Sequence, residues 1–239
     1  MSGRSRWALL LLAVGVGVAG LGSAQTHASA SRRPAPFLAA GDLVKSRVIV
    51  RAAPSMRARK VRVLHEFRKD FRLQIVLAVR EVKGRHHRRW VKLSLPGRPN
   101  GGRGWVLKHS VQVHRVRVRI VIHRGARKLE VKRISTGTVL FRAPVAVGKP
   151  GAKTPLGRDY YVQAGFVPKN RFFGSYAIET SAYSHLSEWP GGGVVGIHGT
   201  DLPGLIGQAV SHGCIRMLNR DVVKLHRLAP LGTPIDILP

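Results

Sequence analysis

The chain has 239 residues and is 44% hydrophobic, so it is long enough for one large or two small domains with real cores. Its 41 lysine and arginine residues against 11 acidic residues give a net charge of +30, which predicts a polyanionic partner. Beyond residue 30, no apolar run approaches the roughly 20 residues that a transmembrane helix needs, which excludes further membrane-spanning helices.

The N-terminus has the pattern of a secretory signal. Arg4 and Arg6 precede an apolar run over residues 7–21, and small residues follow up to Ala30. We therefore expect residues 1–30 to be a signal peptide, and the protein to be exported to the cell envelope outside the cytoplasm. The apolar run is too short to span a bilayer comfortably, and an uncleaved N-terminal anchor is the alternative.

Residues 31–114 have the pattern of a linker followed by a small all-β domain. Residues 31–41 predict a flexible linker, and residues 42–114 carry β-branched or aromatic runs between Pro, Gly and charged turns. The runs are 48–50, 61–64, 73–79, 90–93 and 104–107. Asn100-Gly101 predicts a type I′ hairpin turn, in which both residues need positive φ. The segments 51–55, 90–93 and 98–106 resemble bacterial SH3-like domains, which commonly accompany cell-wall enzymes. Trp90 and Trp105 are then expected in the core.

Residues 115–239 predict a second, mainly β domain. Strict alternation from Arg115 runs on into Ile122 and gives one apolar and one cationic face. Further strands are expected near 129–131, 139–141, 160–162 and 234–238. Asn219 predicts the cap of one short C-terminal helix, whose Val222 and Leu225 share a face. The expected fold class is therefore mainly β, with two successive β domains.

The positive charge is unevenly divided. Residues 31–114 carry 21 basic and 4 acidic residues, a net charge of +17, and residues 115–239 carry 18 and 7, a net charge of +11. For an exported chain this favours anionic cell-wall polymers or acidic lipid head groups, and no signature of a nucleic-acid-binding module is present. We expect residues 31–114 to concentrate the protein on the wall without taking part in chemistry. The alternative is a solvated cationic surface.

The chemistry is expected between residues 197 and 217. Cys214 is the only cysteine, and it follows His198-Gly199-Thr200 by sixteen positions. A lone cysteine in an exported protein indicates a reactive thiol or an intermolecular link, with a small buried hydrophobic side chain as the alternative. His198 can serve as its base, and backbone N–H groups around Gly213 and Cys214 can stabilise an oxyanion, which predicts acyl transfer. A zinc site of Cys214, His198 and His212, and His212 as the base, remain open alternatives.

These residues resemble a known signature. Residues 197–200, 206–207 and 211–217 are similar to the L,D-transpeptidase catalytic domain, whose members cross-link bacterial peptidoglycan. The resemblance covers roughly residues 115–238, and it includes Thr136-Gly137, Thr154-Pro155-Leu156-Gly157, Tyr176, Asn219 and Gly232-Thr233-Pro234. It implies a mostly β sandwich with a lid-like loop over a cleft.

The resemblance also implies roles for individual residues. Cys214 would be the nucleophile and His198 its base, with the Gly199 carbonyl orienting the imidazole. His212 and Gly213, together with Cys214, would line the oxyanion hole. On the substrate side, Arg216 would face a carboxylate, Ser211 would fix the loop, and Tyr176 and Trp189 would have packing and lid roles. The alternative for Arg216 is an ion pair with Asp221. No metal and no organic cofactor are required.

The implied reaction joins peptidoglycan stem peptides. Cys214 would form a thioester with the third stem residue and expel D-alanine, and the amine of another stem would then complete a 3→3 cross-link. Water as acceptor would make an L,D-carboxypeptidase, and a protein lysine would attach a protein to the wall. A carbapenem β-lactam is expected to form a covalent adduct. A non-catalytic wall-binding protein and a secreted nucleic-acid-binding protein are the alternatives from other classes.

Overall fold

The computed structural model describes residues 37–186, 188 and 192–239. The expected signal peptide (1–30), most of the expected linker (31–41) and Trp189 therefore lie outside the described residues. The described residues belong to one unit of the chain. Within them, no helix has the length and apolar character needed to cross a membrane.

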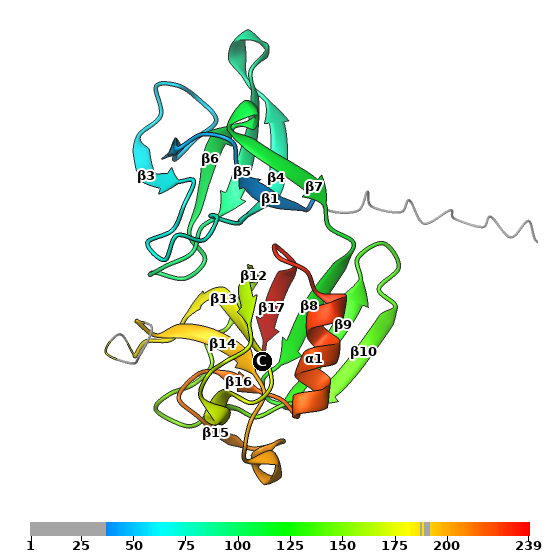
Figure 1. Ribbon diagram of the computed structural model, residues 1–239. Coiled ribbons are helices and arrows are strands. Elements are labelled where there is room, and N and C mark those ends of the chain that lie inside the picture. Colours follow the sequence, from blue (N-terminus) through cyan, green and yellow to red (C-terminus); the bar gives the residue numbers. More distant parts are fainter. Residues whose placement is uncertain (1–36, 187, 189–191) are drawn as a thin grey trace, which may run out of the picture. The chain divides into compact units, whose positions relative to one another are not determined.

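The first sheet has seven antiparallel strands in the order β3-β2-β6-β5-β4-β1-β7 (Figure 1). Its strands are β1 (Ala39–Leu43), β2 (Arg47–Arg51), β3 (Lys60–His65), β4 (Val76–Lys83), β5 (Arg89–Ser94), β6 (Arg103–Leu107) and β7 (Val111–Arg115). Short 3-10 helices lie at η1 (Arg85–His87) and η2 (Lys108–Ser110). Trp90 and Trp105 are buried, which confirms their expected place in the core.

Two local predictions in this sheet are wrong. The expected linker ends earlier, because β1 begins at Ala39 and pairs with both β4 and β7. The type I′ turn is absent, because Gly101 has positive φ (81°) and Asn100 does not. Asn100 instead uses its amide on the backbone of Tyr183, donating to the carbonyl (2.7 Å) and accepting from the N–H (3.0 Å). The likeness to an SH3-like domain stays a prediction.

The second sheet has eight strands in the order β10-β9-β8-β17-β12-β13-β14-β16. Its strands are β8 (Val118–His123), β9 (Lys128–Arg133), β10 (Val139–Pro144), β12 (Gly157–Phe166), β13 (Ala177–Tyr183), β14 (Val194–His198), β16 (Ile215–Arg216) and β17 (Pro234–Leu238). A separate parallel pair is formed by β11 (Val147–Gly148) and β15 (Ala209–Ser211). Short 3-10 helices occur at η3 (Arg171–Phe173) and η4 (Pro203–Leu205), and α1 (Asn219–Leu228) is the α-helix of the described residues. The mainly β fold class is confirmed.

The alternating run that predicted one strand from Arg115 is divided between the two sheets. Arg115 ends β7, where it pairs with Ala39, and β8 starts only at Val118. Between them, Val116 donates its N–H to the carbonyl of Leu38 (3.1 Å) and the Arg117 carbonyl accepts from Ile134 (2.9 Å). The chain therefore passes from one sheet to the next without a long linker.

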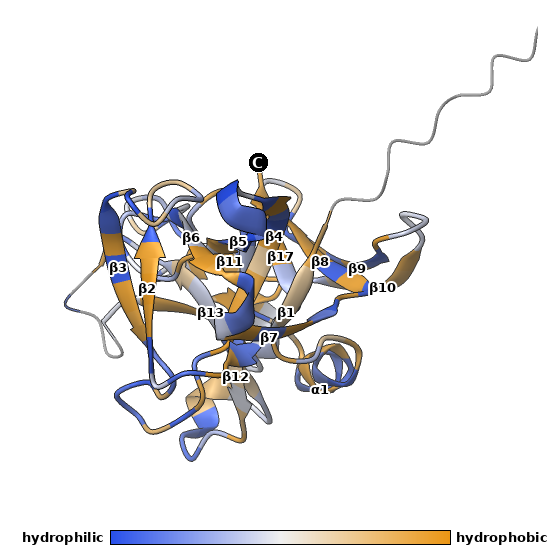
Figure 2. Cartoon of the chain, turned by 90° about the horizontal axis from the view of Figure 1, so that it is seen from above, coloured by the Kyte–Doolittle hydropathy of each residue, from blue (hydrophilic) through white to orange (hydrophobic). Residues whose placement is uncertain are grey.

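Three buried clusters hold the fold together. One fills the seven-stranded sheet, and a second joins the eight-stranded sheet to the buried side of α1, where Val222 and Leu225 lie (Figure 2). The third packs Tyr161 of β12 against residues of the first sheet, among them Leu38 and Leu77. Because Tyr161 and Leu77 are fully buried, the two sheets share apolar core.

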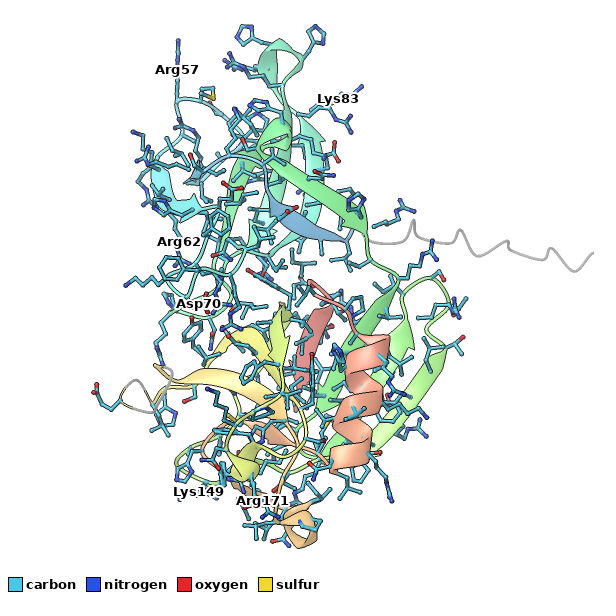
Figure 3. The ribbon with its side chains drawn as sticks, in the orientation of Figure 1. Arg57, Arg62, Asp70, Lys83, Lys149 and Arg171 are labelled. Atoms are coloured by element: carbon cyan, nitrogen blue, oxygen red, sulfur yellow. The ribbon has the colours of Figure 1, made fainter. Side chains whose placement is uncertain are left out.

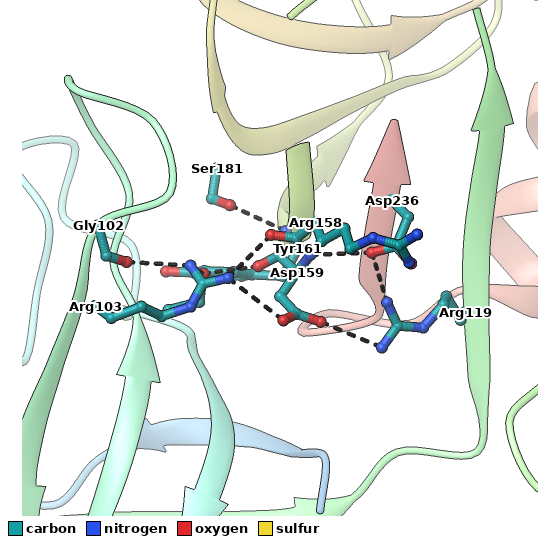
Figure 4. A network of polar contacts seen from close by, with 9 residues as sticks. Gly102, Arg103, Arg119, Arg158, Asp159, Tyr161, Ser181 and Asp236 are labelled. Carbon is teal, nitrogen blue, oxygen red and sulfur yellow. Dashed lines mark hydrogen bonds and ion pairs between the residues drawn. The ribbon is translucent and has the colours of Figure 1, made fainter. Parts of the chain in front are cut away.

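A polar network also links the two sheets (Figure 4). Asp159 on β12 accepts hydrogen bonds from Arg103 of β6 (3.3 Å) and Arg119 of β8 (3.2 Å). Arg119 also pairs with Asp236 of β17 at 2.5 Å, and Asp236 accepts the N–H of Asp159 (3.0 Å). The backbone of Asp159 adopts φ 58°, a region unfavourable for a side-chain-bearing residue, so these contacts fix an otherwise costly conformation.

Candidate active site

Neighbouring strands bring His198 and Cys214 together. His198 ends β14, and Cys214 immediately precedes β16, which pairs in parallel with β14 through Ile197–Ile215 and His198–Arg216. Both side chains line one cavity of about 750 Å³. The pair predicted from the sequence therefore shares a single pocket in the fold.

Gly196 keeps the space around the pair open. Its N–H donates to the Cys214 Sγ atom at 3.4 Å. A Cβ atom at this position would lie 3.8 Å from His198 Cδ2 and 3.9 Å from Cys214 Sγ. Cys214 Sγ and the Cδ2 edge of the imidazole, which carries Nε2, thus border the same small volume.

The backbone fixes the tautomer of His198. Its Nδ1 atom lies 2.6 Å from the Gly199 carbonyl oxygen, and a carbonyl can only accept, so Nδ1 carries the proton and Nε2 is left as the acceptor. The imidazole is 2% exposed. Burial lowers the pKa of His198 to about 4; the Gly199 hydrogen bond acts to raise it and the charge of Arg216 lowers it further. His198 is therefore a neutral base at neutral pH.

Cys214 is protonated in the resting state. Burial raises the pKa of the Cys214 thiol, against the opposing effects of the Gly196 N–H and the Arg216 charge. A neutral thiol beside a neutral imidazole results, rather than a thiolate–imidazolium pair. Proton transfer to His198 must then accompany the attack of sulfur on a substrate carbonyl.

The family follows from comparison with known proteins. A family model described as the L,D-transpeptidase catalytic domain matches residues 117–237, about half of the chain. The chain belongs to this family. The resemblance inferred from residues 197–217 is thereby confirmed.

Two curated relatives match part of the chain. A putative L,D-transpeptidase YkuD of Bacillus subtilis (strain 168) is 36% identical over 118 residues, which is 49% of this chain and 64% of the relative. The same-named protein of Bacillus licheniformis is 42% identical over 96 residues, or 40% and 52%. The chain thus spans less than two thirds of either relative.

Two solved structures from Mycobacterium tuberculosis align with lower similarity. An L,D-transpeptidase from strain H37Rv shares 17% identity at a TM-score of 0.43, over 64% of this chain and 91% of that one. L,D-transpeptidase 3 in complex with a faropenem-derived adduct shares 15% identity at a TM-score of 0.43, over 64% and 92%.

The loop before the cysteine of this L,D-transpeptidase domain is locked by its own hydrogen bonds. Ser211 is buried; its Oγ donates to the Cys214 carbonyl (2.6 Å) and accepts the Gly213 N–H (3.1 Å). Ser211 thus fixes the loop, as the resemblance implied. The prediction that Gly213 offers a free oxyanion donor is wrong, because its N–H is occupied. The Cys214 N–H makes no hydrogen bond to the described residues, so it is the available donor. His212 lies half-buried beside it.

Thr154 anchors the same loop from a distant segment. Its Oγ1 donates to the Gly213 carbonyl (2.9 Å) and accepts the Gly148 N–H (2.9 Å). Gly213 has φ 115°, and a Cβ there would lie 3.0 Å from Ser184 Cβ, so glycine is required. The sequence indicated Thr154 only as part of the residues that carry the family resemblance.

Arg216 makes no ion pair with a described residue. It is 7% exposed, its guanidinium lies 4.7 Å from the Phe172 ring centroid, and its Nε atom is buried without a hydrogen bond. Asp221 lies 3.9 Å from Arg220 instead, so the alternative of an Arg216–Asp221 ion pair is wrong. The positive charge of Arg216 lowers the pKa of both His198 and Cys214.

The sequence missed two aromatic residues over the imidazole. Phe173 meets His198 edge-on at a centroid distance of 5.0 Å, and Phe172 lies 6.1 Å from it. Both come from η3 and line the cavity, where they exclude water from the base. Tyr176 does not join them: its ring stacks on His226 at 4.1 Å and lines a separate cavity, so its predicted place beside the substrate is corrected.

Asn219 positions the histidine rather than capping a helix. α1 has Leu218 at its N-cap without a side-chain cap. The Asn219 amide accepts the Thr200 N–H (3.1 Å) and the Ser175 N–H (3.1 Å), and donates to the Thr200 carbonyl (3.1 Å). It therefore fixes the segment whose Gly199 carbonyl holds His198.

The described ranges contain no group of three or more His, Cys, Asp or Glu side chains arranged to hold a metal ion.

Proposed function

We propose that this chain is a peptidoglycan L,D-transpeptidase that works through a thioester on Cys214. The observation that carries the proposal is the fixed tautomer of His198, whose Nδ1–H is held by Gly199 while Nε2 is left facing the pocket of Cys214. Family membership supports the reaction class.

The acylation step uses the neutral pair. As sulfur attacks the carbonyl of the third stem residue, His198 Nε2 takes the thiol proton. The resulting oxyanion accepts a hydrogen bond from the Cys214 N–H. Collapse breaks the amide bond and expels D-alanine, whose amine takes the proton from His198, leaving the thioester.

The second step resolves the thioester. The side-chain amine of another stem attacks the thioester carbonyl, and His198 takes a proton from that amine. The sulfur leaves and regains the proton as a thiol, so a 3→3 cross-link and the free enzyme result. Water or a protein lysine in place of the amine would give carboxypeptidase or protein-attachment activity.

Incubation with disaccharide-tetrapeptide muropeptides, followed by mass spectrometry, tests the proposal. We expect dimers lacking one D-alanine with the wild type and none with Cys214→Ala. Trimmed tripeptides alone would assign the carboxypeptidase reaction. If neither dimers nor tripeptides form, the proposed function is overturned and a non-catalytic wall-binding protein is favoured.

A basic pocket on the first sheet supports the proposed wall partner. A cavity of about 500 Å³ is lined by Arg57, Arg85, His86, Arg88 and Trp90 among others, and no acidic residue lines it. Figure 3 shows Arg57 pointing outward at this end of the sheet. Anionic wall polymer outside the cytoplasm is the ligand we propose for this surface, with export directed by residues 1–30.

A further inference from the structure

A tight turn between β3 and β4 is closed by its own backbone hydrogen bonds. Phe67 and Leu73 form a bridge at its base, Arg68 donates its N–H to the Arg72 carbonyl (2.8 Å), and Phe71 donates to the Arg68 carbonyl (3.0 Å). Phe71 has φ 62° although it is not a glycine. Backbone strain of this kind often occurs at functional sites, and this turn carries the charged side chains described next.

The turn, although it belongs to the first sheet, lines the Cys214 cavity. Arg68, Asp70 and Arg72 all border that cavity, and Glu179 of β13 borders it from the second sheet. Glu179 pairs with Arg68 and, at 3.2 Å, with Arg72. Asp70, labelled in Figure 3, pairs with the same two guanidinium groups at 3.1 and 2.6 Å. Two arginines and two carboxylates thus form one balanced cluster.

The strand register places this cluster next to the reacting sulfur. Glu179 lies directly opposite Gly196 on β14. Paired residues in an antiparallel sheet project to the same face with Cβ positions about 4.5–5.5 Å apart. A Cβ atom on Gly196 would lie 3.9 Å from Cys214 Sγ, so Glu179 projects from its strand to the face that holds the thiol.

Both guanidinium groups keep unused donors. The Nη1 atom of Arg68 is buried without a hydrogen-bond partner in the described residues. Arg72 uses Nε and Nη2 on Asp70 and Glu179, while its Nη1 makes no hydrogen bond to the described part of the chain. The Arg72 side chain is 45% exposed and its guanidinium lies 5.9 Å from the Phe166 ring centroid. A guanidinium held on one edge presents its other edge to a carboxylate.

We propose that Arg72, fixed by Asp70 and Glu179 and backed by Arg68, is a carboxylate-recognition subsite of the Cys214 cavity. The inference rests on the proposed function, since stem peptides carry free carboxylates near the bond that Cys214 would attack. The first sheet then contributes directly to substrate specificity. Arg72 contacts the ligand, and Glu179 is a positioning residue.

The first test needs no peptidoglycan substrate. Iodoacetate and iodoacetamide alkylate a thiol with the same leaving group, and they differ by one carboxylate. We expect Arg72→Gln to lower the iodoacetate rate at Cys214, relative to the iodoacetamide rate, by about 3- to 10-fold, and Arg72→Lys to keep most of the wild-type ratio. Arg59→Gln, which removes an exposed charge outside the cavity, is the matched control. An unchanged ratio in Arg72→Gln, or an equal fall in Arg59→Gln, would overturn the subsite.

The second test identifies which carboxylate is recognised. Tetrapeptide donors are prepared with one carboxylate amidated at a time: that of the D-isoglutamyl residue, that of the diamino-acid side chain, or the terminal one. We expect one amidation to cost the wild type about 10- to 100-fold in kcat/KM, mainly through KM, and Arg72→Gln to erase that difference.

The two proposals fail in different ways. If Arg72→Gln slows every donor equally, the subsite is refuted while transpeptidation stands. If no donor reacts but the alkylation ratio still follows Arg72, the carboxylate subsite stands and the proposed function is refuted.

Discussion

Gly196→Ala puts one methyl group beside the two groups that react. The new Cβ would lie 3.6 Å from the Ile178 carbonyl oxygen, 3.8 Å from His198 Cδ2 and 3.9 Å from Cys214 Sγ. These are ordinary van der Waals distances, and Gly196 does not have positive φ. The folded state should therefore accept the methyl, and we expect the free energy of unfolding to change by less than about 1 kcal/mol.

The effect on acylation should be much larger. A substrate carbonyl must come to about 3–3.5 Å from Sγ, in the volume that the methyl would now share. A misplacement of about 1 Å costs on the order of 10²-fold in rate. We therefore expect kcat/KM to fall by about 10- to 100-fold, equivalent to about 1.4–2.8 kcal/mol in the activation free energy.

Steady-state turnover of tetrapeptide donors and a thermal melt test this together. Gly204→Ala is the matched control, because Gly204 also lacks positive φ and has no heavy atom within 4 Å of the added Cβ. Wild-type kcat/KM in a normally folded Gly196→Ala variant would refute the placement of the substrate carbonyl at this gap.

Four further changes test the site and the surface. Cys214→Ser should lower turnover on the order of 10³-fold or more without loss of the fold; dimer formation at the wild-type rate would exclude Cys214 as the nucleophile. The pKa of Cys214 is raised and that of His198 is about 4. The rate of alkylation of Cys214 by iodoacetamide should therefore rise with pH up to at least 8.5, with no plateau near neutrality. A plateau at pH 5–7 would instead indicate a thiolate–imidazolium pair in the resting enzyme. Asn219→Ala should lower kcat about 10-fold with little change in KM, since the segment next to Gly199 loses both of its hydrogen bonds to Asn219 and Ser175 loses a third. An unchanged kcat would remove Asn219 from the positioning of His198. Binding to purified sacculi, measured by co-sedimentation, should weaken steeply as salt rises, because exposed charges are screened over about 8 Å at physiological ionic strength. Salt-insensitive binding would argue against the basic pocket as the wall-binding surface.

Local patterns in the sequence were sufficient for the elements and for the reacting pair. The last strand, Pro234–Leu238, was predicted with its observed bounds, and the predicted short C-terminal helix is present as α1. Cys214 and His198 could be found because residue type and spacing alone identify a thiol and a base. Each of these features depends on residues close in sequence.

Predictions failed where a side chain serves a distant segment. Asparagine is common in turns and at helix caps, yet the side-chain amides of Asn100 and Asn219 form hydrogen bonds with backbone groups of other strands or loops. The Gly213 N–H is taken by Ser211, a detail of loop conformation rather than of composition. Tyr176 lies near the active site in sequence order but turns to His226. Tertiary hydrogen bonds decided the two asparagine cases, a local loop hydrogen bond decided Gly213, and ring stacking decided Tyr176. A single sequence displays none of these contacts.

The first sheet needs a different interpretation from the one that its charge suggested. Its net charge of +17 favoured a separable wall-binding role, but Tyr161 is fully buried against Leu38, Leu77 and their neighbours, so removing residues 31–114 would expose the core of the second sheet to water. Loss of activity in such a truncation would then report unfolding as readily as lost recognition. Point changes that leave Tyr161 covered avoid this, because Arg72 and the arginines of the basic pocket lie on the surface of the same sheet but line different cavities. Varying them separately tests the two proposals independently: substrate recognition by Arg72 beside Cys214, and wall binding by the basic pocket.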